Sequence, residues 1–192
     1  GPIPSDSHRE ALQQTTARGI LAVAAAHNQT NDNDVMPRYP ASYDVPRIVA
    51  VATTDQNDDL ATFSNWGRTN VDLAAPGVAI LMTGGPGTNT YRTGNGTSFS
   101  CPHVAGSAAL LFAAYPDATP EDVKTALLET VDLIPALTNR LVSHGRLNIG
   151  RAMVQSSLNG PPLIYGQPQD QVAVLGHSAT FAVAARGRSP LA

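Results

Sequence analysis

The sequence predicts an α/β fold in which a parallel β-sheet is flanked by helices, followed by a partial antiparallel β segment. Two apolar runs of strand length, residues 20–27 and 47–55, are rich in Ala, Val and Ile and indicate buried strands. A helical pattern precedes the first run, and parallel neighbours in a sheet require crossover connections of this kind. The 192 residues, of which 42% are hydrophobic, suffice for the core of one ordinary domain with a remainder.

The N-terminal segment predicts a helix over residues 7–19, directly before the first apolar run. Ser7 is expected to cap this helix, Glu10 to act as its capping-box partner, and Gly19 to end it. The polar, turn-rich stretch between the two apolar runs, residues 29–46, is expected to be a loop.

The second half of the domain alternates short strands with helices. Residues 71–80 predict a short strand that a Pro-Gly pair interrupts, and the glycine-rich residues 83–90 predict a surface turn. A long helix is expected over residues 98–115. Thr119 is then expected to cap the next helix, with a proline at its first position, and residues 145–153 predict a last strand followed by a helical turn.

The composition changes near Asn159, which predicts a domain boundary. Residues 1–157 are expected to form the α/β domain, and residues 158–169, rich in Pro, Gly and Gln, to form a linker. Residues 170–192 alternate apolar with small or polar side chains, as antiparallel strands do, and resemble the start of a bacterial immunoglobulin-like domain. A complete sandwich needs about seven strands, so this segment is expected to be truncated.

The composition argues against several kinds of partner. Charged residues make up 14% of the chain, the formal net charge is −3 and Lys and Arg form no cluster, so no nucleic-acid partner is expected. No apolar run approaches the roughly 20 residues that cross a bilayer, so no membrane partner is expected. The single cysteine, Cys101, excludes an internal disulfide, and no Cys/His pair has zinc-like spacing.

The segment GTSFSCPHVAG, residues 96–106, carries the chemistry. It places Ser98 after a Gly-Thr turn at the start of a helix, where the Ser98 N–H would point toward a negative oxygen formed when the hydroxyl attacks a carbonyl. A structural alternative stays open, because serine is also a common helix cap. Phe99 argues against a dinucleotide-binding glycine fingerprint, and the chain holds no Gly-x-Ser-x-Gly elbow of an esterase.

The same segment resembles the nucleophile signature of the subtilisin-like serine proteases, and the likeness extends over roughly residues 8–155. It implies a subtilisin-like fold, with Ser98 as the nucleophile and Asn28 as the donor of a side-chain amide to the oxyanion. It also implies a secreted serine endopeptidase that hydrolyses protein or peptide substrates, and identifies residues 1–157 as the C-terminal part of its peptidase domain. The other similar runs are ILAVAAAHN, YPASYDVPRIVAVATTD, ATFSNWG and VDLAAPGV.

The catalytic aspartate and histidine of that family have no counterpart in the sequence. His103 lies five residues beyond Ser98 on the same predicted helix, at a position that belongs to the scaffold in the family, so it is not expected to be the base. The chain is therefore expected to be a fragment that is inactive and poorly folded alone and requires the N-terminal half of the peptidase domain. His27 is a further departure, because the family usually has glycine before the asparagine, and a larger side chain there would crowd the substrate pocket.

A second hypothesis is a non-catalytic protease-like scaffold or adhesion module with an immunoglobulin-like tail. The presence of both Ser98 and Asn28 favours the enzyme, because a scaffold has no chemical need of either. No cofactor is expected for the chemistry. Asp72 matches an acidic position that binds a cation in some relatives, and a carboxylate with carbonyl oxygens would suit a structural Ca²⁺ or Na⁺; capping of a turn is the alternative.

Overall fold

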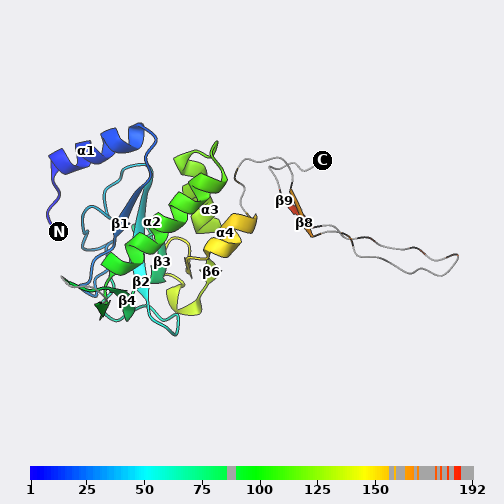
Figure 1. The fold of residues 1–192 in the computed structure, drawn as a ribbon. Coiled ribbons are helices and arrows are strands. Elements are labelled where there is room, and N and C mark those ends of the chain that lie inside the picture. The colour runs from blue at the N-terminus through cyan, green and yellow to red at the C-terminus, as the bar shows by residue number, and fades with distance from the viewer. Residues whose placement is uncertain are drawn as a thin grey trace.

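A five-stranded β-sheet forms the centre of the described part of the chain (Figure 1). The structure is a computed structural model that describes residues 1–85, 90–155, 163–166 and 184–186 and positions 158, 168, 176, 178 and 181. The strands of the five-stranded sheet are β1 (Ala22–Ala25), β2 (Ile48–Thr54), β3 (Leu73–Pro76), β6 (Asp132–Leu133) and β7 (Gly145–Arg146). Their order is β1-β2-β3-β7-β6, with only β6 antiparallel to its neighbour. The predicted parallel sheet is therefore confirmed.

Helices flank this sheet, and the strand β2, which pairs on both sides, contributes to the core on both faces. The helices are α1 (Asp6–Ala17), α2 (Thr97–Ala114), α3 (Pro120–Glu129) and α4 (Ile149–Gln155), with a 3₁₀ turn at Pro135–Leu137. Every residue of β2 is buried, as the apolar run predicts. Because side chains alternate along a strand, Val49 and Val51 pack with Leu111 of α2 in one cluster. Ile48 and Ala50 belong to a second cluster on the opposite face.

The helix α1 begins two residues earlier than the sequence predicts. Its N-cap is Ser5, whose Oγ accepts a hydrogen bond from the main-chain N of His8, so the predicted cap at Ser7 is wrong. Ser5 also donates its main-chain N–H to the hydroxyl of Tyr43 at 2.8 Å, and this tertiary contact holds it in the extended conformation of a cap. Glu10 consequently lies beyond the third helical position that a capping box requires.

The strand β1 is less buried than the sequence predicts. Only Ala24 of its four residues is buried, and Ile20, just before it, is 51% exposed. The physical reason is position: β1 pairs with β2 on one side and is the edge strand of the described sheet. An apolar run can identify a strand, but the sequence does not say which strands lie at the edge.

The predicted start of α3 and the strand break near Pro76 are both present. Thr119 caps α3, and Asp122 closes a capping box with it. After β3 the chain forms an antiparallel hairpin of β4 (Ile80–Thr83) and β5 (Tyr91–Gly94), which leads directly into α2. Residues 86–89 of the predicted glycine-rich turn lie outside the described residues.

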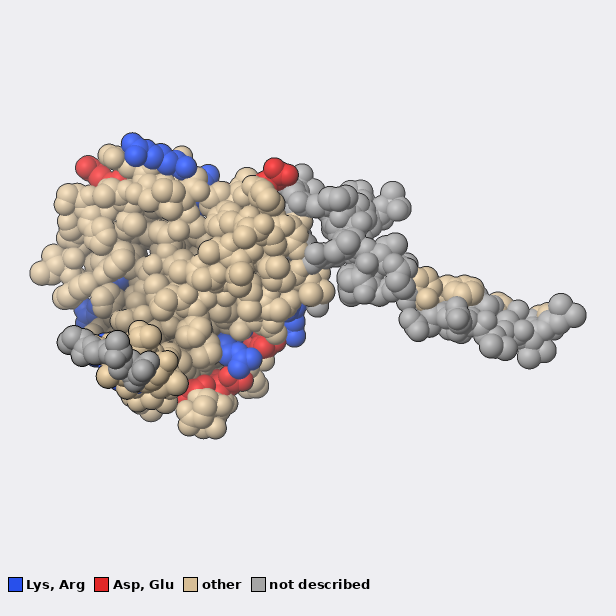
Figure 2. Space-filling view, viewed as in Figure 1, with Lys and Arg blue, Asp and Glu red and all other residues tan. Residues whose placement is uncertain are grey.

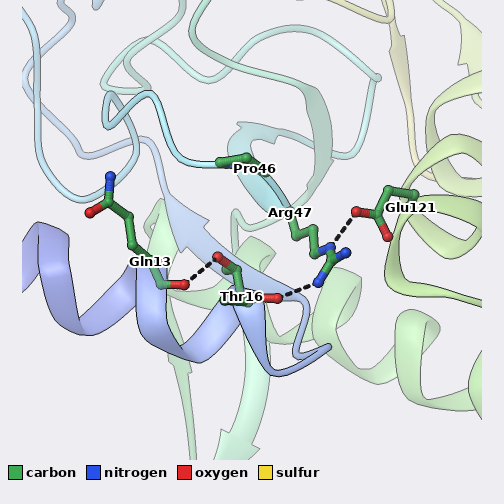
Figure 3. A pocket seen from close by; sticks show the side chains of 6 residues that line it. Gln13, Thr16, Pro46, Arg47 and Glu121 are labelled. Carbon is green, nitrogen blue, oxygen red and sulfur yellow. Dashed lines mark hydrogen bonds and ion pairs between the residues drawn. The ribbon is translucent and has the colours of Figure 1, made fainter.

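One arginine joins α1 to α3 across the start of β2. The guanidinium of Arg47 donates to the main-chain O of Thr16 and pairs with Glu121, beside a shallow pocket of about 350 Å³ (Figure 3). Thr16 is the only buried residue of α1. This clamp therefore attaches the C-terminal end of α1 to the start of β2 and to α3.

The C-terminal predictions fall mostly outside the described residues. Two short strands, β8 (Leu163–Gly166) and β9 (Ala184–Arg186), pair antiparallel, and β8 lies within the segment predicted as a linker. Most of residues 170–192 lies outside the described residues, so the immunoglobulin-like assignment stays a prediction. Within the described residues, no helix combines the length and the apolar character needed to cross a bilayer.

Candidate active site

Ser98 is the second residue of α2, and its hydroxyl does not cap the helix. The N-cap is Gly96, which makes no side-chain capping bond and has φ of 149°, a conformation that favours glycine. Ser98 is exposed, and its Oγ has no hydrogen-bond partner within the described residues. The capping alternative for this serine is therefore wrong, and its hydroxyl is available to an incoming group.

Asn28 follows β1 and lies against the first residue of α2. Its Oδ1 accepts hydrogen bonds from the main-chain N of Thr97 at 2.9 Å and from the Thr97 hydroxyl at 3.0 Å. Since both bonds need an acceptor, they assign the oxygen of the amide to this side, and Nδ2 faces the other way. Thr97 thus orients the amide, a contact that sequence reasoning missed.

Two nitrogen donors, Asn28 Nδ2 and the main-chain N of Ser98, lie near one position beside Gly96. A Cβ built on Gly96 would lie 3.3 Å from Asn28 Nδ2 and 3.7 Å from the main-chain N of Ser98. Both donors therefore border one small space, which the absence of a side chain at Gly96 leaves open. Two fixed donors at a helix N-terminus can stabilise an oxyanion there. The fold brings together the two residues that the sequence singles out.

His27, the residue before Asn28, has φ of 81°, which explains why a glycine suits this position. Its main-chain N donates to the Thr97 hydroxyl at 3.2 Å, and its ring Nε2 lies 3.0 Å from the carbonyl O of Tyr39. Burial lowers the pKa of His27, so the ring is neutral at pH 7 and Nε2 carries the hydrogen donated to Tyr39. The imidazole is therefore tied to the Tyr39 main chain.

The described residues supply no base for Ser98. The ring Nδ1 of His103 lies 2.7 Å from the carbonyl O of Phe99, one turn back on α2, and makes no hydrogen bond to Ser98. His8, on α1, lies edge-on to the ring of Tyr43, at 5.7 Å between ring centroids, and makes no bond to Ser98. His27 and the half-buried His144 also make no bond to Ser98. The remaining histidine lies outside the described residues.

Asp72, the predicted cation ligand, is already paired. Its carboxylate lies 3.1 Å from the ammonium of Lys124 and accepts the main-chain N–H of Ala50 at 2.7 Å. The described part of the chain holds no group of three or more His, Cys, Asp or Glu side chains arranged for a metal ion. The Ca²⁺ or Na⁺ site stays a prediction that no described contact supports.

A buried asparagine cluster behind Asn28 also escapes sequence reasoning. Asn31, Asn33 and Asn65 are at most 8% exposed, although two of them fall in a stretch that the sequence predicts as a polar loop. Buried amides must find partners, and here they bond to one another and to the main chain around Asn28. Asn65 stands more than 30 positions from Gln29, Asn31 and Asn33, to which its side chain bonds, so no local pattern reveals these contacts.

Known proteins with similar sequences and structures agree on one family. The sequence profile of the Subtilase family matches residues 2–161. Thermitase of Thermoactinomyces vulgaris is 37% identical over 153 residues, which are 80% of this chain and 51% of thermitase. Subtilisin-like protease 2 of Plasmodium falciparum (isolate 3D7) is 33% identical over 158 residues, which are 79% of this chain and 12% of that protein.

The fold is similar to solved subtilase structures. The structure of the prenylagaramide maturation protease PagA superposes with a TM-score of 0.68 at 28% identity, covering 80% of this chain and 56% of that one. The matched part of the chain thus spans 12% of the length of the Plasmodium protein, and about half the length of thermitase and of PagA. Because the family profile covers most of the chain and the fold agrees with it, the chain belongs to the subtilase family, whose characterised members are serine endopeptidases.

Proposed function

We propose that this chain carries the nucleophile and the oxyanion hole of a subtilisin-like serine endopeptidase that acts on protein or peptide substrates outside the cell. The observation that carries the proposal is that Asn28 Nδ2 and the main-chain N of Ser98 border one space beside Gly96, next to an exposed hydroxyl without a hydrogen-bond partner in the described chain. Donors that are fixed before the reaction stabilise a developing oxyanion without reorganisation.

In the proposed reaction, Ser98 Oγ attacks the carbonyl carbon of the peptide bond while its proton passes to a histidine that this sequence does not supply. The carbonyl oxygen becomes an oxyanion, which accepts hydrogen bonds from the Ser98 N–H and from Asn28 Nδ2. The C–N bond then breaks, the histidine gives its proton to the leaving amine, and an ester on Ser98 remains. Water hydrolyses this ester by the same steps.

We further propose that the preceding half of the peptidase domain supplies the histidine and its aspartate and packs against α2 and β1. An apolar groove of about 400 Å³ lies between these elements, lined by small and apolar side chains that include Ile20, Ala109 and Phe112. Figure 2 shows that the face over α2 consists mainly of uncharged side chains. The lining of the groove is apolar, and large exposed apolar patches are uncommon on folded domains, so we expect another part of the protease to cover this face.

The experiment uses the complete protease that contains this chain. A fluorophosphonate probe should label it at Ser98, and Ser98→Ala should abolish labelling. Asn28→Ala should lower kcat by about 10² to 10³ with little change in KM, a magnitude known from subtilisin itself. Gln29→Ala is the matched control, since this exposed neighbour contributes only its main-chain N–H. A folded, unlabelled protein would favour the scaffold or adhesion module instead.

A further inference from the structure

Asn65 holds the main chain on both sides of Asn28. Its main-chain N donates to the carbonyl O of His27 at 2.9 Å, directly before Asn28. Its side-chain Oδ1 accepts from the main-chain N of Gln29 at 2.7 Å and of Asn31 at 3.2 Å, directly after it. One buried residue therefore brackets the candidate oxyanion donor without touching the reacting atoms.

Asn65 is itself fixed from two directions. Its Nδ2 donates to Asn33 Oδ1 at 2.9 Å, and Asn33 in turn donates to the carbonyl O of Ala26 at the end of β1, at 3.1 Å. The Ser64 hydroxyl donates to the Asn65 carbonyl O at 2.9 Å and accepts the Thr53 N–H of β2 at 3.0 Å. Asn33, Ser64 and Asn65 are all 0% exposed. A continuous set of hydrogen bonds thus joins β2 to the segment that carries Asn28.

The chemistry of position 65 is specific to an amide side chain. The site needs one oxygen that accepts two N–H groups and one nitrogen that donates to Asn33 Oδ1. A carboxylate would keep the acceptor, but one of its oxygens would face Asn33 Oδ1 without a hydrogen between them. An apolar side chain would leave the N–H groups of Gln29 and Asn31 without this acceptor, the second of them buried. Asparagine meets all three demands at once.

We propose that Asn65 is a positioning residue of the oxyanion hole: it sets the main chain around Asn28 so that Nδ2 stays directed at the space beside Ser98, while Thr97 orients the amide itself. The inference rests on the proposed function. A misplacement of about 1 Å can cost up to about 10²-fold in rate, so the loss of a bracket on Asn28 should be visible in kcat.

The test is a double-mutant cycle in the complete protease. Asn65→Ala should lower kcat by about 10- to 100-fold with KM little changed. In an Asn28→Ala background the same substitution should cost less than about 2-fold, because its effect passes through Asn28. Asn70→Ala is the matched control: its Nδ2 donates to the main-chain O of Asn33 at 3.3 Å, in the same cluster, and makes no bond to residues 27–31. It should leave kcat unchanged.

The outcomes separate the two proposals. If Asn28→Ala leaves kcat unchanged, the proposed oxyanion hole fails. If Asn28→Ala lowers kcat but Asn65→Ala does not, or if Asn65→Ala costs the same in both backgrounds, Asn65 is merely structural and the inference is overturned. Should the alanine variant not fold, Asn65→Asp keeps the acceptor for Gln29 and Asn31. Asn65→Asp should lower kcat by less than Asn65→Ala is expected to, and this loss should disappear in the Asn28→Ala background; a loss that persists there would overturn the inference.

Discussion

Gly96 keeps open a space that Asn28 Nδ2 and the main-chain N of Ser98 border. In Gly96→Ala the methyl group would lie 3.3 Å from Asn28 Nδ2 and 3.7 Å from Ser98 N, in the space proposed for the oxyanion, on a backbone whose φ of 149° already disfavours a side chain. We expect kcat of the complete protease to fall by at least about 10², the loss of an oxyanion donor, together with slower fluorophosphonate labelling.

Gly150→Ala provides the control for Gly96→Ala. Gly150 lies at the exposed start of α4, and its added Cβ would meet only Asn148 Oδ1 at an ordinary 3.5 Å. This variant should keep full labelling, because alanine favours a helix over glycine. Equal labelling of the two variants would show that the space at Gly96 does not take part in the reaction.

At the scale of single residues, the sequence identifies the proposed reacting residues but not the residues that hold them in place. Ser98 and Asn28 follow from a resemblance, since each stands in a short run typical of the family. No sequence pattern identifies Asn65, because its side-chain partners lie at positions 29 to 33 and the bonds form only when β1 and β2 are side by side. Thr97 orients Asn28 for the same kind of reason, across 69 positions of the chain.

Asp132 makes stability depend on pH. The hydrogen bond from Asn148 and the nearby guanidinium groups of Arg146 and Arg151 lower the pKa of its carboxyl. A lowered folded-state pKa contributes stability above the unfolded value of about 3.9, and this contribution is lost as pH falls through the folded value. Asp132→Asn should therefore lower Tm at neutral pH, and the gap to the unsubstituted protein should narrow in acid. A gap that stays constant down to about pH 3 would contradict this assignment.

At the scale of helices and strands, the sequence predicts the start of a helix correctly where contacts within the first turn determine that start. The start of α3 follows from its sequence, because Thr119 and Asp122 cap it within one turn. The start of α1 does not, because a hydrogen bond between Ser5 and Tyr43, 38 positions away, moves the cap. The burial of β1 also depends on neighbours, which no periodicity in residues 20–27 encodes.

The attachment of α1 gives a prediction at the same scale. Arg47→Met removes the clamp between the carbonyl O of Thr16 and Glu121, and little else of α1 is buried. Amide hydrogen exchange in α1 should become at least about tenfold faster, while exchange in β2 changes little. Arg18→Met, at the exposed C-cap of α1, should leave both unchanged because no described contact uses its side chain. Unchanged exchange in Arg47→Met would show that other contacts hold the helix.

For the whole molecule, the decisive feature is the apolar face of α2 and the edge of β1. An exposed alanine on a free helix surface tolerates aspartate at a cost of about 0.5 kcal/mol, whereas an unpaired charge buried in an interface costs several kcal/mol. Ala109 is exposed in this chain and lines the groove beside β1. The same substitution can therefore tell whether another part of the protease covers this face.

We expect Ala109→Asp to lower the Tm of the complete protease by several degrees and to reduce its fluorophosphonate labelling, because the preceding half of the domain would bury the charge. Thr125→Asp, at an exposed position on α3, is the matched control and should shift Tm little. Residues 1–155 expressed alone should bind a hydrophobic dye and lack a single cooperative unfolding transition, since the groove and the β1 edge stay uncovered. A soluble isolated chain that unfolds cooperatively, together with an unaffected Ala109→Asp protease, would mean that this face is a finished surface and that the histidine reaches Ser98 from another side.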